Sequence, residues 1–162
     1  MECGNYSMGV TPATPATQPL RGQPLRGPAW TLAQYHHVAQ HLRAIRQSCG
    51  INQPEFARQL QIRQSHIPRW ELYGTLPSIK TLERIAAILD GAGYVPPPEL
   101  KGWTIAQAMQ AVSTLPTNSA TYVALRVNEG TIRNWRRGTL PQLDLLLRVE
   151  AYIAQQRRER AS

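Results

Sequence analysis

The chain contains an internal repeat, and this feature constrains its fold more than any other. Residues 30–34 (WTLAQ) recur at 103–107 (WTIAQ), and the motif GTLP at 74–77 recurs at 138–141. Segments that recur in this way usually form the same supersecondary unit twice. Since 162 residues suffice for two small units, we expect two related units rather than one larger domain.

The composition between and before the two copies predicts the domain boundaries. We expect the units over residues 30–90 and 103–162, joined by a Gly/Pro-rich linker over 91–102. Residues 1–29 contain five of the 13 prolines and predict a disordered arm, because such a segment buries little apolar surface. The arm is either a basic segment that lies along DNA or an inert tail, and its two arginines are few enough to favour the tail.

Both units are expected to be helical, which makes the fold class all-α. Thr31 and Thr104 each stand three residues before a glutamine, which is the pattern of a helix capping box. Apolar residues recur at steps of three and four from Leu32 to Cys49, which predicts one long first helix. Later helices are predicted to start at Asn52, about Gln64 and Ser78. The second copy repeats this order in fewer residues.

The charge balance points to polyanions as partners. The chain has 18 Lys and Arg against 10 Asp and Glu, a formal net charge of +8, and 16 of the basic residues are arginines. Arginine suits phosphates and guanine edges better than lysine does. The excess of basic residues is divided equally between the two parts of the chain, because residues 1–98 and 99–162 each hold nine basic and five acidic residues.

The same composition argues against several classes of function. Two aspartates, Asp90 and Asp144, make a carboxylate cage for two metals implausible, and two cysteines make no disulfide framework. His37 and His41 lie one helical turn apart, but no third metal ligand is evident near them. We find no glycine-rich phosphate loop, nucleophile elbow or metalloprotease motif, so we expect neither enzyme activity nor a cofactor or metal. The chain also lacks an apolar run for a membrane span and a signal peptide, so we expect a cytoplasmic protein.

Residues 42–89 hold small, apolar and charged residues at the spacing of two helices that cross at a tight turn. These are Arg46, Gly50, Gln53, Glu55, Ala57, Leu60, Ile62, Ser65, Ile67, Glu71, Gly74, Pro77 and Leu82. The pattern resembles the helix-turn-helix domain of the Cro/C1/XRE repressor family, which implies a bacterial, plasmid or phage origin. With the second copy included, the resemblance implies two lambda-repressor-like helical bundles in tandem, each with a recognition helix that enters the major groove.

The family pattern implies roles for residues of the first unit. Base edges are expected to be contacted by Gln64, Ser65 and Arg69, since Gln pairs best with adenine and Arg with guanine. Phosphates are expected to be held by Asn52, Gln53, Arg63, Thr75 and Lys80. Arg46 and Glu71 match a pair that forms an ion bridge beneath the recognition helix, so their expected role is structural.

Pro68 departs from the family pattern. If the recognition helix starts near Gln64, Pro68 falls on about its fifth residue and removes a backbone hydrogen bond, at a cost of up to ~3 kcal/mol. If the helix starts at Ser65 or His66, Pro68 lies in the first turn, where proline is tolerated. The later start would rotate the outer face of the helix and place Gln64 in doubt as a base contact.

The second copy is a weaker match to the same pattern. It implies base contacts by Thr131, Arg133, Asn134 and Arg137 and a phosphate contact by Arg136. However, Arg136 stands where the first unit has Glu71, and Tyr122 replaces the small Ala57. The second copy is therefore either a second DNA-binding unit or a degenerate copy that serves as a dimerisation or partner-binding platform. The arginines favour DNA contact.

These features together predict a transcription regulator that binds double-stranded DNA in a sequence-specific manner. The expected mechanism is repression, in which the protein at the bacterial nucleoid occupies its operator and excludes or repositions RNA polymerase. The sequence leaves two binding modes open: one chain binds both half-sites, or two chains bind as a homodimer. Two other classes compete with this prediction. One is an interaction protein, such as an antitoxin or anti-activator, that binds a regulator protein; the other is an architectural protein that coats DNA with little sequence preference.

Overall fold

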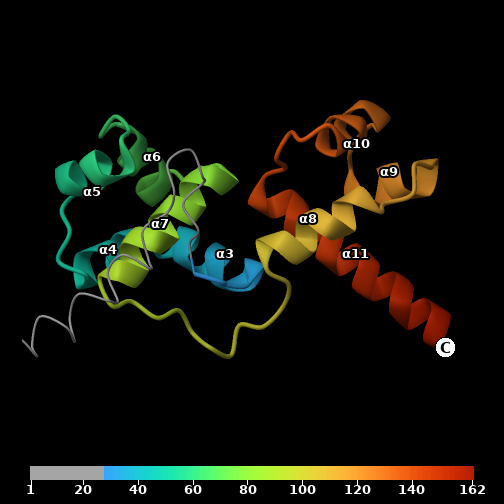
Figure 1. Ribbon diagram of the computed structural model, residues 1–162, viewed down its shortest axis with the longest axis horizontal. Helices are drawn as coiled ribbons and strands as arrows, with labels where there is room; N and C mark the ends of the chain where they lie inside the picture. The colour runs from blue at the N-terminus through green and yellow to red at the C-terminus, as the bar shows by residue number, and fades with distance from the viewer. Residues whose placement is uncertain (1–27) are drawn as a thin grey trace, which may run out of the picture.

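The structure, a computed structural model, describes residues 28–162, and the regular elements in this range are α-helices without a strand. The expected all-α fold class is thereby confirmed. The first half of the fold contains α3 (Leu32–Gln40), α4 (Leu42–Ser48), α5 (Gln53–Leu60), α6 (His66–Leu72) and α7 (Ile79–Gly91). The second half contains α8 (Ile105–Ser113), α9 (Ser119–Leu125), α10 (Glu129–Arg136) and α11 (Leu143–Ala161) (Figure 1). The arm expected over residues 1–29 lies outside the described residues except for its last two.

The helices that open the two halves begin with matching caps. The Thr31 hydroxyl accepts the Gln34 N–H at 3.1 Å, and the Gln34 side-chain carbonyl accepts the Thr31 N–H at 2.9 Å. Thr104 and Gln107 form the same reciprocal pair at 3.3 and 3.0 Å. Both predicted capping boxes are therefore confirmed, and each satisfies two N–H groups at a helix N-terminus.

A break separates α3 from α4 where one long helix was expected. His41 adopts φ −117° and ψ 25°, outside the helical region, although its N–H still donates to the His37 carbonyl at 3.0 Å. The buried apolar face continues across the break from Val38 to Leu42 and Ile45. The prediction of one continuous helix is therefore wrong. The spacing of the apolar residues is the same with or without a bend at His41, so it could not predict the break.

The two halves contribute to a single apolar core. Its fully buried side chains include Phe56, Leu60, Ile67, Leu82 and Leu89 from the first half and Leu115, Leu125, Ile132 and Leu146 from the second. Burial of one such side chain stabilises the fold by about 1.5–3 kcal/mol. Ile67 of α6 and Ile132 of α10 are both 0% exposed, so each of these two surface helices is anchored through its inner face. None of the helices in residues 28–162 has the length and hydropathy that a bilayer span requires.

The segment between α7 and α8 packs against the start of α3 instead of forming a free tether. The Gln34 side-chain amide donates to the Pro97 carbonyl at 3.0 Å, and the Thr31 hydroxyl donates to the Leu100 carbonyl at 2.7 Å. Pro96 is buried in the same segment. These contacts restrain the orientation of one half of the fold relative to the other.

Candidate nucleic-acid interface

α5 and α6 meet at a tight turn that leaves α6 at the surface. α5 ends at Gln61, whose backbone is left-handed with φ 58° and ψ 43°. The next N–H, that of Ile62, donates to the Ala57 carbonyl at 3.0 Å. Ala57 is 3% exposed, so the helices approach each other over a side chain of only one carbon. Ile67 then buries the inner face of α6 and fixes its angle to α5.

The start of α6 resolves the position of Pro68. The helix begins at His66, with Ser65 as its N-cap residue. Pro68 is therefore the third helical residue, where a backbone N–H would have no intrahelical partner. The start near Gln64 is wrong and the later start is confirmed. Gln64 lies in the turn before the helix, and its exposed side chain is not on the helical face itself.

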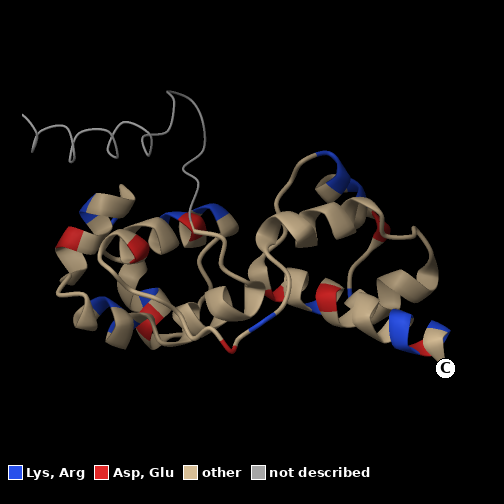
Figure 2. Ribbon diagram, turned by 60° about the horizontal axis from the view of Figure 1, so that its bottom comes forward, with Lys and Arg blue, Asp and Glu red and all other residues tan. Residues whose placement is uncertain are grey.

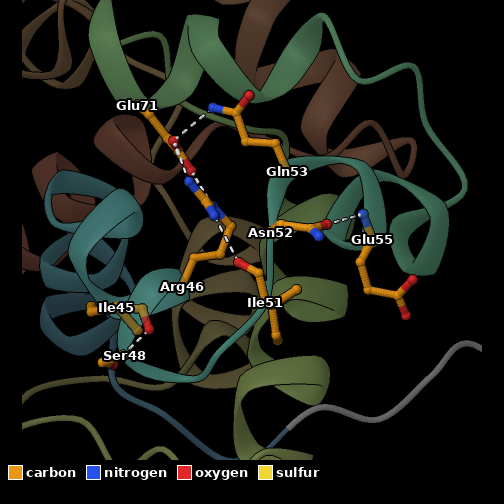
Figure 3. Close-up of polar contacts among 8 residues, drawn as sticks. All are labelled: Ile45, Arg46, Ser48, Ile51, Asn52, Gln53, Glu55 and Glu71. Carbon is orange, nitrogen blue, oxygen red and sulfur yellow. Dashed lines mark hydrogen bonds and ion pairs between the residues drawn. The ribbon is translucent and has the colours of Figure 1, made fainter.

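A buried ion pair ties α6 to α4 (Figure 3). Arg46 donates to the Glu71 carboxylate through Nε at 2.7 Å and through Nη2 at 3.0 Å. Its Nη1 donates to the Ile51 carbonyl at 2.7 Å. The Arg46 side chain is 5% exposed and that of Glu71 is 0% exposed. Bidentate pairs of this kind are directional, so the pair holds α6 in one orientation against α4.

Gln53 belongs to this buried network. Its side-chain amide donates to Glu71 Oε1 at 3.1 Å, and the residue is half-buried (Figure 3). One N–H of the Gln53 amide is used by Glu71, which leaves the second N–H for the predicted phosphate contact. The neighbouring Asn52 is exposed, but its side-chain carbonyl caps α5 by accepting the Glu55 N–H at 2.9 Å. Only the amide NH₂ of Asn52 remains for a phosphate.

The exposed charges of α5 pair with each other. Arg58 donates to the Glu55 carboxylate at 2.9 and 2.6 Å, and Gln59 donates to it at 2.8 Å. The Arg58 donor, followed by Gln59, lowers the pKa of the Glu55 carboxyl below its ordinary value, and Glu55 raises the pKa of Arg58. The side chains of Arg58 and Glu55 are 73% and 38% exposed. Such exposed pairs contribute little to stability, so this pair is a natural reference for the buried one.

α9 and α10 are joined by the same kind of turn as α5 and α6. Arg126 ends α9 with φ 56° and ψ 45°, and the Val127 N–H donates to the Tyr122 carbonyl at 3.0 Å. Tyr122 therefore stands at the position of Ala57 without disrupting the turn. The preceding residue, Thr121, is 0% exposed and stands at the position of Phe56. The large and small residues have exchanged places between the halves, which conserves volume at the crossing.

Arg136 links α10 to the segment that follows α8. Its Nη2 donates to the Leu115 carbonyl. Arg136 stands at the sequence position of Glu71, so both residues connect their helix to a preceding segment. Glu71 of α6 accepts hydrogen bonds from Arg46, whereas Arg136 of α10 donates one. Arg136 is exposed, so the other N–H groups of its guanidinium remain for the predicted phosphate contact.

Some of the other polar side chains of α10 also pair with neighbouring residues of the protein. Arg133 pairs with Glu129 at 2.6 Å, and the Thr131 hydroxyl donates to the Asn128 side-chain carbonyl at 3.0 Å. That carbonyl also caps α10 by accepting the Thr131 N–H at 2.8 Å. Two further predicted contacts are exposed near the C-terminal end of the helix: Asn134 and Arg137. Figure 2 shows the basic stretch at this end of α10 at the edge of the molecule.

The helix-turn-helix family model matches residues 42–92, from the start of α4 to one residue beyond α7. Residues 42–92 are therefore similar to helix-turn-helix domains. The match covers about a third of the chain and supports a DNA-binding regulator of the XRE type. Comparison with curated proteins and with solved structures gives no significant match.

Within the matched residues, the helix after the tight turn, α6, has an exposed outer face. Arg69 and Ser65 are exposed, as are the predicted phosphate contacts Arg63, Thr75 and Lys80. His66 and Tyr73 lie three residues before and four residues after Arg69, which places them on the same face, and Tyr73 is 78% exposed. Sequence reasoning missed both residues. The preference of proline for the first turn of a helix was the signal that could have predicted the start of α6. The start of the helix then determines which residues lie on this face.

Pro68→Ala in α6 is expected to change the free energy of unfolding by less than ~1 kcal/mol. The substitution restores no helical hydrogen bond, because Pro68 already lies in the first turn of α6. It removes only the rigidity that proline gives to the unfolded chain. Chemical denaturation of the full chain measures the change. A gain approaching ~3 kcal/mol would contradict a helix start at His66.

Proposed function

We propose that this chain is a sequence-specific, double-stranded-DNA-binding transcription regulator that represses by occupying its operator. The observation that carries the proposal is the exposed polar face of α6, presented by a helix that the buried Arg46–Glu71 pair fixes. Major-groove recognition requires a rigid helix whose polar side chains need no reorganisation on binding. The family match over residues 42–92 supports the same conclusion.

In this proposal α6 enters the major groove with its N-terminal end toward the bases. Arg69 donates to a guanine edge, and Gln64 reaches an adenine from the turn before the helix. Arg63, Thr75 and Lys80 hold the flanking phosphates and thereby set the register of the helix on the duplex. Ser65 contributes a hydroxyl at the N-cap, where its side chain caps no helical N–H.

We infer that residues 103–162 form a second, degenerate helix-turn-helix unit. The left-handed turn residue after α9 and the Asn128 cap of α10 support this inference. Asn134 and Arg137 are its DNA contacts. Arg133 contributes less because Glu129 competes for its guanidinium. Arg136 donates to the Leu115 carbonyl, and its remaining N–H groups contact a phosphate.

Operator occupancy requires no catalytic step. A bound chain covers promoter DNA and excludes RNA polymerase from it, which is the simplest use of two DNA-binding units in one protein. Because DNA is the target, the protein would act at the bacterial nucleoid.

Footprinting on the DNA upstream of the protein's own gene, combined with transcription in vitro from the same fragment, tests this function. We expect a protected stretch that overlaps the promoter and less transcript as protein is added. Protection without a change in transcript would contradict repression but not DNA recognition. An absence of protection would favour an interaction protein such as an antitoxin or anti-activator.

Arg137→Ala is expected to shorten the footprint on the side that the second unit covers. The exposed Arg137 side chain lies at the end of α10, and its loss removes the main charged contact of that helix. Arg157→Ala, near the end of α11 and equally exposed, is the matched control and should leave the footprint unchanged. An unchanged footprint in both variants would indicate that the second unit is a platform for dimerisation or for a protein partner.

A further inference from the structure

The two halves of the fold meet at residues that correspond to each other in the sequence repeat. Thr31 and Thr104, which occupy the same place in WTLAQ and WTIAQ, form an antiparallel β-bridge. Within it the Leu32 N–H donates to the Trp103 carbonyl at 2.7 Å. An antiparallel bridge has a local twofold axis between the two residues that it pairs. Since the paired residues are equivalent, this axis relates the first half to the second.

A second pair of equivalent residues lies at one cleft between the halves. The loops after α6 and α10 both carry GTLP, and each leads to the N-cap residue of the next helix, Ser78 or Gln142. Both N-cap residues line one cleft of about 540 Å³. One wall of the cleft comes from Ser78–Lys80 and the other from Gly138–Gln142. Ser78 and Gln142 are equivalent in the repeat, and a twofold axis through the cleft places such a pair on opposite walls.

Two further contacts join the halves. α11 packs against α3, and Glu83 of α7 lines one pocket with Thr104, Ile105 and Ala106 at the start of α8. Burial at this contact raises the pKa of the Glu83 carboxyl. Figure 1 shows the resulting arrangement, in which α6 and α10 lie along the same edge of the molecule while α7 and α11 diverge from its centre.

We propose that one chain binds an imperfect inverted repeat in DNA, with the axis between Thr31 and Thr104 placed on the centre of the operator. This inference rests on the proposed function of both units. A twofold axis between two recognition helices matches a dyad of the duplex, so the two half-sites run in opposite directions. On adjacent turns of the major groove the half-sites are about 34 Å apart.

The two half-sites differ because the two recognition helices differ. α6 offers Gln64, Ser65 and Arg69, whereas α10 offers Asn134 and Arg137. Gln or Asn favours adenine and Arg favours guanine, at positions that differ between the helices. A symmetric homodimer binds two identical half-sites and has no direction on DNA. This chain binds two unequal half-sites, so it occupies the operator in one orientation only.

Selection of bound sequences from a pool of random duplexes, with the purified full chain, tests the inference. We expect two unequal half-sites in inverted orientation, and one chain per duplex by native mass spectrometry. Arg69→Ala should remove base preference in one half-site, and Arg137→Ala should remove it in the other. Direct repeats, or two identical half-sites bound by two chains, would overturn the inference while leaving a DNA-binding regulator in place. A pool that yields no preferred sequence would overturn the proposed function itself.

A spacing series on the selected duplex separates a fixed interface from a flexible tether. Insertion of half a helical turn, ~5 base pairs, between the half-sites should lower the affinity about 10-fold or more. Insertion of a full turn should not restore the affinity, because the contacts of Thr31 and Gln34 with the connecting segment prevent the halves from separating. Recovery of affinity at a full turn would show that the halves separate freely, and would overturn the fixed axis.

Discussion

Glu71→Ala is expected to lower the free energy of unfolding by about 3–5 kcal/mol, because it leaves a buried charge without its partner. Arg46 is 5% exposed and loses both of its hydrogen bonds to the carboxylate. The Gln53 amide loses its partner as well. For a protein of this length, a loss of this size lowers Tm by roughly 10 °C. Thermal and chemical denaturation of the full chain, followed by circular dichroism, measure both quantities.

Glu55→Ala is the matched control, since it makes the same chemical change in the exposed Arg58–Glu55 pair. That loss is expected to be much smaller than the loss in Glu71→Ala, because an exposed ion pair contributes little to stability. The double variant Arg46→Met with Glu71→Met leaves no unpaired charge and should recover most of the stability. Equal losses in Glu71→Ala and Glu55→Ala would contradict the structural role of the buried pair.

Arg69→Ala is expected to lower affinity for the preferred duplex by about 1–3 kcal/mol, which corresponds to roughly 5- to 150-fold. Arg69 is exposed on the outer face of α6, so its removal leaves the fold intact while a base-edge contact is lost. Affinity for random duplex should fall only slightly, because non-specific binding depends on phosphates. Fluorescence anisotropy with both duplexes measures the two losses.

Lys80→Ala provides the comparison that separates base recognition from charge. Lys80 is exposed at the start of α7 and is assigned to a phosphate. Its loss should weaken binding to preferred and random duplexes by the same factor and should reduce the salt slope by about one. If Arg69→Ala behaved in the same way as Lys80→Ala, Arg69 would be a phosphate contact and its assignment to a base edge would be refuted.

The features that the sequence predicted correctly are local ones. The capping boxes at Thr31 and Thr104 depend on residues three positions apart, so a spacing rule finds them. The first-turn position of Pro68 was one of two alternatives that the sequence left open, and the chemistry of proline favours the one observed. The all-α class follows from helical spacing of the apolar residues over many turns.

The features that the sequence missed depend on contacts between distant segments. The sequence did not predict that an Arg136 N–H donates to the Leu115 carbonyl, 21 residues earlier. It also did not predict that the Gln53 amide donates to Glu71 on another helix. The packing of the segment between α7 and α8 is a third case. Nothing in the sequence at Pro97 or Leu100 predicts that their carbonyls accept hydrogen bonds from Gln34 and Thr31. Local spacing contains no information on such pairs.

The ratio of two dissociation constants tests the central claim most directly. The claim is that this chain recognises a DNA sequence through the exposed face of α6. Binding of the full chain to its preferred duplex and to a shuffled duplex of equal length is measured at one physiological salt concentration. The account predicts a preference of roughly 10³ or more for the preferred duplex. Nearly equal constants would contradict it and would identify a protein that coats DNA without regard to sequence.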